Sequence, residues 1–326
     1  MNKIFKLFLV ALLTVVGFAF GGTALAGGEN DSEDDISSEV AQTGSSNSGD
    51  AVGGQVVGVV SAGDASVDAT NRSEDVDIET GEASAENDLE QVVGQEMEGE
   101  DGATNESEAE ISSEVGQDAS AVSGDGVGGS VIGVVTSAGG SADVVAANTS
   151  EDVDIETGDA TAFNFLDADV GQLQLDDGDN DSEDDISFEA AQAVSAATGD
   201  GVGGQVLGIV SAGDASVDAT NESTDVDVET GDAYAENDAE YEVGQENIGG
   251  GDNFSDGDIS SELAQDASAN SGDAVAGQVA GVVTSAGGSA DLVLANTSED
   301  VDGESGFSEF VNESEEFVGQ QIDIPL

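Results

Sequence analysis

Residues 64–71 read Asp-Ala-Ser-Val-Asp-Ala-Thr-Asn, and small apolar side chains alternate with polar ones along them. Successive side chains of an extended strand point to opposite faces, so this period of two predicts a half-buried β-strand. Ala65, Val67 and Asn71 share the face that we expect to be buried. The sequence therefore predicts an all-β fold.

The alternation changes phase further along the chain. Val76 and Ile78 occupy even-numbered positions, whereas Ala83 returns to odd ones. We expect tight turns near residues 71–74 and at Thr80-Gly81 to cause these changes. The spacing of such signals predicts strands of about five to eight residues, the usual range.

One acidic sequence recurs four times at a spacing near 75 residues. It runs from Asn30 to Gln42, Asn105 to Gln117, Asn180 to Gln192 and, shortened, Ser255 to Gln265. A Gly-Gln pair closes each copy, at positions 94–95, 171–172, 244–245 and 319–320. Such periodicity indicates units that bury their apolar faces against one another. We predict repeats at 30–104, 105–179, 180–252 and 253–320.

The repeats are of two kinds that alternate. The first and third share the sequence at 61–71 and 211–221, and the second and fourth share that at 136–143 and 284–291. On the outward face, the second and fourth carry Val145 and Val293 where the first carries Asp68. This less polar strip predicts either a contact between subunits or packing beneath a loop.

Composition favours a thin interior. Only seven of the 11 Phe residues lie after residue 26, and Trp is absent. A sandwich core about 10 Å thick usually needs larger side chains. We therefore predict a repetitive β-solenoid of four units of about 75 residues, with tandem small β-sandwich domains as the alternative. The high charge also fits a chain that is disordered without cations.

Residues 1–26 have the composition of a signal peptide. Lys3 and Lys6 precede an apolar stretch from Leu7 to Phe20, and Ala24-Leu25-Ala26 forms a small-residue cleavage site. An uncleaved membrane anchor is the alternative, although the apolar run is short for a span. Residues 27–29 then form a short N-terminal segment, and residues 321–326 a C-terminal strand or tail. We expect a secreted protein, extracellular or on the cell surface, without a membrane span after cleavage.

Charge is the strongest constraint on function. The net charge is −69, and loss of residues 1–26 leaves one base, Arg72, against 72 acids, hence −71. Two carboxylates on neighbouring strands repel by about 0.9 kcal/mol even at the dielectric of water. We therefore expect bound divalent cations, calcium first and magnesium second, to be part of the folded state. Nucleic acid is excluded as a partner, since the mature chain cannot neutralise phosphates.

The sharpest acidic motif is Asp-x-Asp-x-Glu, present once in each repeat. Residues i, i+2 and i+4 of a strand share a face, so three carboxylates project together and predict oxygen ligands for calcium. A solvated face with diffuse counterions is the alternative. The predicted metal ligands are Asp75, Asp77, Glu79, Asp152, Asp154, Glu156, Asp225, Asp227, Glu229, Asp300, Asp302 and Glu304.

Asn-x-Ser sequons recur at matching places of the repeats. They predict N-linked glycans if the cell glycosylates exported proteins. Four of them share the inward phase, and for these we favour buried asparagine ladders. These four are Asn71, Asn148, Asn221 and Asn296.

Residues 42–55 resemble a known family. Gln42-Thr-Gly44-Ser-Ser-Asn47, followed by Ala51 and Gln55, is similar to the repeat core of curlins, the subunits of bacterial extracellular fibres. Gln192 and Gln205 keep the spacing of the two glutamines. The resemblance implies a stacked β-solenoid that assembles with itself outside the cell.

Together these features predict an exported structural protein, a cation-stabilised acidic repeat subunit of an extracellular filament, matrix or surface layer. A monomeric calcium-binding surface adhesin is the alternative. Absence of Cys and His, and of Lys after residue 26, removes thiol, imidazole and amine chemistry. Paired carboxylates would still suit a glycosidase, but four near-identical motifs mark no unique centre. We therefore expect no enzymatic activity.

Overall fold

The computed structural model describes residues 9–21, 29–32, 35–98, 104–136, 140–176, 179–249, 252–284 and 288–323. Every helix or strand assigned within these ranges is a β-strand, and the strands form five sheets, named A to E here. The all-β prediction is confirmed.

Each sheet collects equivalent strands from successive repeats. Sheet A contains β1 (Leu9–Gly21), β7 (Ala83–Glu98), β13 (Ala160–Asp176), β18 (Ala233–Gly249) and β23 (Ser308–Asp323). Sheet B contains β2 (Glu29–Ser32), β8 (Thr104–Ser107), β14 (Asp179–Ser182) and β19 (Asn253–Ser255). Sheet C contains β3 (Ile36–Asn47), β9 (Glu110–Val122), β15 (Asp185–Ala197) and β20 (Ile259–Asn270).

Sheets D and E complete the set. Sheet D contains β4 (Ala51–Val52), β5 (Gln55–Ser61), β10 (Gly126–Val127), β11 (Ser130–Thr136), β16 (Gly201–Ser211) and β21 (Ala274–Thr284). Sheet E contains β6 (Ala65–Glu79), β12 (Ala142–Glu156), β17 (Ala215–Glu229) and β22 (Ala290–Glu304).

All of these strand pairs are parallel. Each pair joins one repeat to the next, except that β1, which precedes the first repeat, pairs with β7. We call the strands β2–β7 rung 1, β8–β13 rung 2, β14–β18 rung 3 and β19–β23 rung 4. The register aligns equivalent residues, so that Asn71 pairs with Asn148, Asn148 with Asn221, and Asn221 with Asn296. We call such a set of aligned residues a column and name it by its rung 1 residue.

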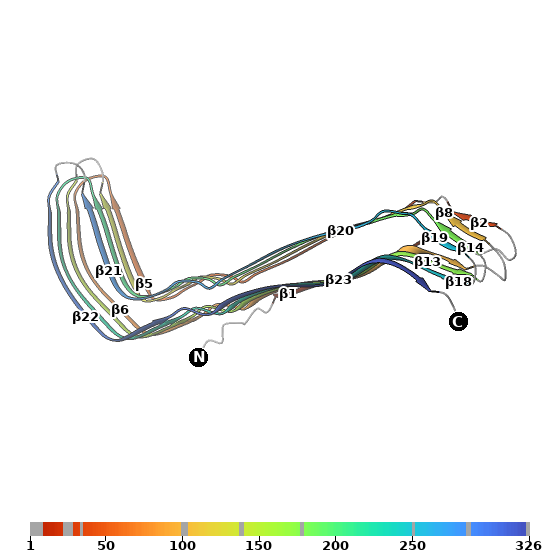
Figure 1. Ribbon diagram of the computed structural model, residues 1–326. Helices are drawn as coiled ribbons and strands as arrows, with labels where there is room; N and C mark the ends of the chain where they lie inside the picture. The colour runs from red at the N-terminus through yellow and green to blue at the C-terminus, as the bar shows by residue number, and fades with distance from the viewer. Residues whose placement is uncertain are drawn as a thin grey trace.

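Figure 1 shows a long, thin molecule. Sheets A and C, which include β23 and β20, run as two facing layers, and sheets D and E face each other in an arm at one end. Sheet B lies at the opposite end. Parallel strands stacked in repeating sheets are consistent with a β-solenoid. Tandem sandwiches are wrong as an alternative, because their strands would pair within a repeat rather than between repeats.

The interior is lined by small side chains for much of its length. Ala83 and Ala121 belong to an alanine-rich cluster between sheets A and C, and larger residues such as Leu89 and Phe188 fill a second cluster between the same sheets. Ile132 represents the aliphatic cluster between sheets D and E. This narrow core explains why few aromatic residues suffice.

Two expectations about the strands were wrong. The long strands have 12 to 17 residues rather than five to eight. Strand β6 also passes through residues 71–74 without a turn. The phase changes instead at Asp75, whose φ of 53° makes a bulge that reverses the alternation. At Thr80-Gly81 the strand does end, since residues 80–82 separate β6 from β7, although none of these three residues is assigned as a turn.

Candidate functional site

The four Asp-x-Asp-x-Glu motifs come together in sheet E. The register aligns Asp77 with Asp154, Asp227 and Asp302, and Glu79 with Glu156, Glu229 and Glu304. Neighbouring strands lie about 4.8 Å apart, so each of these columns is an unbroken file of like charges. All eight of these side chains are exposed on the outer face.

The first aspartate of each motif lies in a left-handed bulge. Asp75, Asp152, Asp225 and Asp300 have φ values of 53°, 52°, 50° and 51°. The strand pairing passes over these residues, joining Glu151 to Glu74 and then Val153 to Val76. Aspartate tolerates this conformation better than most residues. The bulge therefore places one more carboxylate per rung beside the 77 column.

These acids line a groove of about 650 Å³ that crosses rungs 2 to 4. Its walls include Asp152 and Asp154, Asp225 and Asp227, and Asp300 and Asp302. Partial desolvation in the groove raises the pKa of Asp154, and the charges of Asp227 and Asp77 raise it further. The groove thus concentrates negative potential, which is the condition for attracting cations.

The twelve predicted ligands lie in columns along the stack and do not surround a common point. Within the described ranges, no group of three or more acidic side chains is close enough to hold a metal ion in its present arrangement. Calcium takes six to eight oxygen ligands, including water, in flexible geometry. Carboxylates of adjacent rungs, such as Asp154 and Asp227, are the residues available to bind it. Calcium binding stays a prediction.

In two other columns of sheet E, acidic residues of adjacent rungs do not lie next to each other. The 68 column reads Asp68, Val145, Asp218, Val293, and the 66 column reads Ser66, Asp143, Ser216, Asp291. Acids therefore alternate between the two columns, which doubles the separation of like charges within each. Val145 is 48% exposed and Val293 59%, but Asp218 lies between them. The less polar strip expected from the sequence is thus interrupted, and its valines separate charges.

Arg72 lies among these acids. Its Nε lies 3.1 Å from Glu74 Oε2 and its Nη2 lies 3.1 Å from Glu151 Oε2, so it links rungs 1 and 2. Both ion pairs are solvent exposed, and such pairs contribute about 0–1 kcal/mol. One arginine therefore relieves little of the repulsion.

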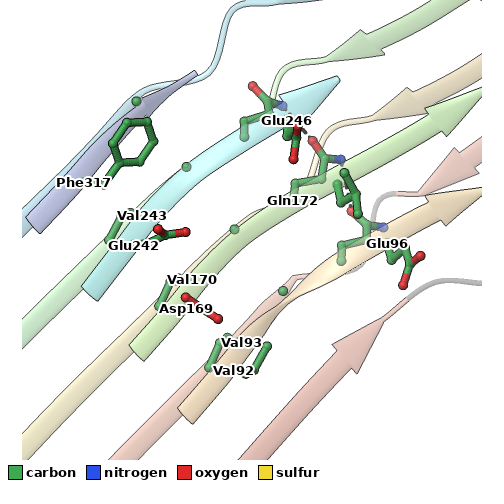
Figure 2. A pocket seen from close by; sticks show the side chains of 17 residues that line it. Val92, Val93, Glu96, Asp169, Val170, Gln172, Glu242, Val243, Glu246 and Phe317 are labelled. Atoms are coloured by element: carbon green, nitrogen blue, oxygen red, sulfur yellow. Dashed lines mark hydrogen bonds between the residues drawn. The ribbon is translucent and has the colours of Figure 1, made fainter. Parts of the chain in front are cut away.

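A second acidic groove, of about 410 Å³, crosses sheet A beside the Gly-Gln pairs (Figure 2). Asp169 and Glu242 are register partners on β13 and β18, flanked by Val92 on β7 and Phe317 on β23. Burial raises the pKa of Asp169, and Glu242, Asp167 and Glu90 add to the rise. The sequence predicted no site here, because rung 1 has valine and rung 4 has phenylalanine at this position.

Amide side chains form continuous columns inside the molecule. Gln117 Nε2 donates to Gln42 Oε1, Gln192 Nε2 to Gln117 Oε1, and Gln265 Nε2 to Gln192 Oε1, each at 2.8 Å. The same nitrogens also donate to backbone carbonyls of sheet A, for example from Gln117 to Phe165 at 2.8 Å. The 42 column therefore ties sheet C to sheet A in every rung.

The asparagine ladder expected at residue 71 is present in part. Asn148 Nδ2 donates to Asn221 Oδ1, and Asn221 Nδ2 to Asn296 Oδ1, both at 2.9 Å. Among the described residues, Asn71 Nδ2 and Asn148 Oδ1 are buried without a hydrogen-bond partner. Asn71, Asn148 and Asn221 are at most 4% exposed, so a glycan cannot attach to them in the folded state. The sequon residues Asn105 and Asn180 are buried as well, at 0% and 1% exposed. Glycosylation of the remaining sequons stays a prediction.

Turn aspartates add a ladder that the sequence analysis missed. Asp50 Oδ1 accepts the backbone N–H of Asp125 at 3.1 Å, Asp125 Oδ1 that of Asp200 at 2.9 Å, and Asp200 Oδ1 that of Asp273 at 2.9 Å. Hydrogen bonds to a charged acceptor are stronger than neutral ones. Repetition of Ser-Gly-Asp or Thr-Gly-Asp at these positions was the signal that could have revealed it.

Comparison with protein-family models, curated proteins and solved structures finds no match for this chain. The curlin resemblance therefore stays a prediction. In the described ranges, none of the secondary structure is a helix with the length and apolarity needed to cross a membrane.

The perturbed carboxyls predict a stability that falls as pH rises. Burial also raises the pKa of Asp184, which is fully buried, even though Ala109, Ser107 and Ser182 hydrogen bond to it. With Asp154 and Asp169, it holds more protons in the folded than in the unfolded state above pH about 4. Stability is therefore greatest at and below that pH and decreases as pH rises through the folded-state pKa values. We expect a higher thermal midpoint at pH 4 than at pH 7, measured by circular dichroism in chelator with enough sodium chloride to keep the wild-type chain folded.

The contribution of Asp184 has its own control. An Asp184→Asn chain keeps an acceptor for Ala109 N–H but has no proton to lose, so its midpoint should change less between pH 4 and pH 7. A midpoint that rises with pH in the wild-type chain would contradict the assignment.

Proposed function

We propose that this chain is an exported structural protein, a solenoid of four repeats of about 75 residues that serves as a cation-stabilised subunit of an extracellular filament, matrix or surface layer. One observation carries the proposal. Each repeat pairs in register with the next, and the stack ends in strand edges, on rung 4 and on most of rung 1, that have no partner in the described chain. Unpaired edges of long strands are templates for pairing with another chain.

Calcium is the cation that we propose for the outer face, with magnesium second. The 77 and 79 columns align like charges in every rung, and their oxygen ligands suit a hard cation. A cation between two rungs would replace a repulsion with two attractions. Cation binding would thus couple the stability of the stack to the ionic conditions outside the cell.

A monomeric calcium-binding surface adhesin with the same fold is the second candidate. The broad acidic groove on sheet E supports it, because that groove lies on the side of the stack and needs no second copy. Catalysis is not part of the proposal, since the carboxylates recur in every rung and converge on no unique pair.

Sedimentation of the exported protein separates the two candidates. In low salt with chelator we expect a small, poorly ordered species, and on addition of millimolar calcium we expect large polymers. Circular dichroism on the same samples should show a gain of β-signal with calcium. A compact monomer in calcium would support the adhesin, and an ordered monomer in both conditions would contradict the requirement for cations.

A further inference from the structure

Strand β1 pairs with the edge of rung 1. Its register is the one that a strand of a further rung, stacked before rung 1, would have. β1 pairs with β7 from Leu9 with Ala83 to Gly21 with Gln95. In the same sheet, β23 pairs with β18 from Ser308 with Ala233 to beyond Gln320 with Gln245. Ala83 and Ala233 belong to one column, so Leu9 stands where Ser308 of a preceding copy would stand.

We propose that this β7 edge is the docking site for β23 of a second copy of the chain, so that rung 4 of one copy stacks on rung 1 of the next. The proposal rests on the proposed function and specifies which faces of the subunit meet. In this proposal β1 covers the β7 edge only until residues 1–26 are removed or displaced, and it is absent from the joint between two copies.

The side-chain oxygen of Asn87 on β7 lacks a hydrogen-bond donor, and Asn312 on β23 has a side-chain N–H that could supply one. Asn87 Nδ2 donates to Asn164 Oδ1, Asn164 Nδ2 to Asn237 Oδ1, and Asn237 Nδ2 to Asn312 Oδ1, each at 2.9 Å. Asn87 is fully buried, and its Oδ1 has no hydrogen-bond partner in the described chain. β1 has Leu13 at this register position, a residue without a side-chain donor. Asn312 of a second copy would supply the missing N–H.

The 42 column is complementary at its two ends. Within the stack, each glutamine Nε2 donates to the Oε1 of the preceding rung. Rung 1 therefore presents the donor Gln42 Nε2, and rung 4 presents the acceptor Gln265 Oε1. The direction of donation matches rung 4 followed by rung 1, and it would not match two rung 1 faces or two rung 4 faces.

The alternation of the two kinds of repeat also favours a joint in which rung 4 of one copy meets rung 1 of the next. Rung 4 followed by rung 1 repeats the step from rung 2 to rung 3, and it places Val293 next to Asp68 and Asp291 next to Ser66 of the following copy. The separation of like charges therefore continues across the joint. In the 77 column, Asp302 would meet Asp77, so assembly through this joint requires cations.

Glycines show that both end faces have the shape of an interior face. A Cβ at Gly94, Gly171 or Gly244 would lie 2.2, 2.1 or 2.5 Å from a carbonyl oxygen of the next rung, whereas at Gly319 it would meet only Phe317, at 3.9 Å. At the other face, a Cβ at Gly124, Gly199 or Gly272 would lie 2.3, 2.2 or 2.0 Å from the preceding rung, whereas at Gly49 it would meet nothing within 4 Å. The isolated chain has room for a side chain at Gly319 and Gly49, but the joint does not.

The sequence of β1 lacks the glycine of this column. Phe20 stands at the register position that is glycine in the other four strands of sheet A. Together with Leu13 opposite Asn87, this makes β1 a poorer match for the edge than β23.

Two single substitutions test the joint from opposite sides. Gly319→Ala should block the rung 4 face and Gly49→Ala the rung 1 face, while each exported protein keeps the wild-type circular dichroism in calcium. We expect each variant alone to sediment as a monomer. An equimolar mixture should give a 1:1 dimer that grows no further, because only the unblocked faces can join. Gly58→Ala is the control, since a Cβ there meets nothing within 4 Å and neither do its column partners Gly133 and Gly208; this variant should polymerise like the wild-type chain.

Failure of this joint is distinguishable from failure of the proposed function. If the wild-type chain does not polymerise in calcium, the proposed function is wrong. If it polymerises and both glycine variants polymerise equally well, the joint is elsewhere. Should a glycine variant lose its β-signal, Asn312→Asp provides the same test, since it keeps the acceptor for Asn237 and removes the donor for Asn87. We expect it to raise the critical concentration by about tenfold or more, and an unchanged value would overturn the proposal.

Discussion

Replacing Asp77, Asp154, Asp227 and Asp302 together by asparagine should let the chain stay folded in chelator and low salt, where the wild-type chain loses its β-signal. The substitution removes an unbroken file of like charges and leaves amides, which can hydrogen bond to one another along the column. Three neighbouring pairs at about 0.9 kcal/mol each correspond to a rise in thermal midpoint of roughly 5–10 °C. Thermal unfolding followed by circular dichroism, in chelator with enough sodium chloride to keep the wild-type chain folded, measures the difference in midpoint.

Four charges removed elsewhere provide the matched control. Substituting Asp68, Asp143, Asp218 and Asp291 by asparagine lowers the net charge equally, but these acids alternate between two columns and do not stack. We expect a clearly smaller rise in midpoint. Equal effects of the two quadruple variants would show that only total charge matters, and the columns would then lose their role as cation sites.

Gly171→Ala should disrupt the pairing of rungs 2 and 3. The new Cβ would lie 2.1 Å from the carbonyl oxygen of Gly244, which belongs to the backbone and cannot rotate away. Overpacking costs about 1–3 kcal/mol and occasionally more, and we expect at least the upper end because two strands must separate. Hydrogen exchange should show faster exchange of the β13 and β18 amides on either side of residue 171.

Gly133→Ala is the control for this substitution. It lies in the same rung and also within a strand, but a Cβ there meets nothing within 4 Å. We expect its free energy of unfolding to stay within about 0.5 kcal/mol of the wild-type value or to rise, since alanine restricts the unfolded chain. If the two variants are equally stable, the close approach at Gly171 is not a constraint on the stack.

The general fold could be predicted from local alternation and from the repeat. Ala65 and Asn71 are buried and Asp68 is exposed, as the period of two indicates. The bulge at Asp75 could not be predicted, because the neighbouring aspartates of the same motif lie on the outer face of an ordinary strand and nothing in the sequence distinguishes Asp75 from them. The sequence alone therefore suggested a turn where the chain continues as one long strand.

The sequence predicted those parts of the candidate site that have the same local sequence in every repeat, and missed those that do not. The acids of the 77 column occupy the same place in each motif, so their assembly followed from the repeat. Asn87 and Asn164 lie in dissimilar surroundings, Glu-Asn-Asp and Phe-Asn-Phe, and nothing in the local sequence marks them as one buried column. Separation of charge between the 66 and 68 columns likewise depends on the register, which only the structure provides.

Paired strands in this chain are separated by 73 to 77 residues of sequence, as the partners Asn148 and Asn221 illustrate. Almost no contact is local, so the first pairing must close a very long loop before any enthalpy is gained. Folding of an isolated copy is then slow, because this first loop closure costs entropy before neighbouring strand pairs compensate for it. A preformed end would act as a template that removes this barrier, and growth by such seeding would show a lag phase that added fragments abolish.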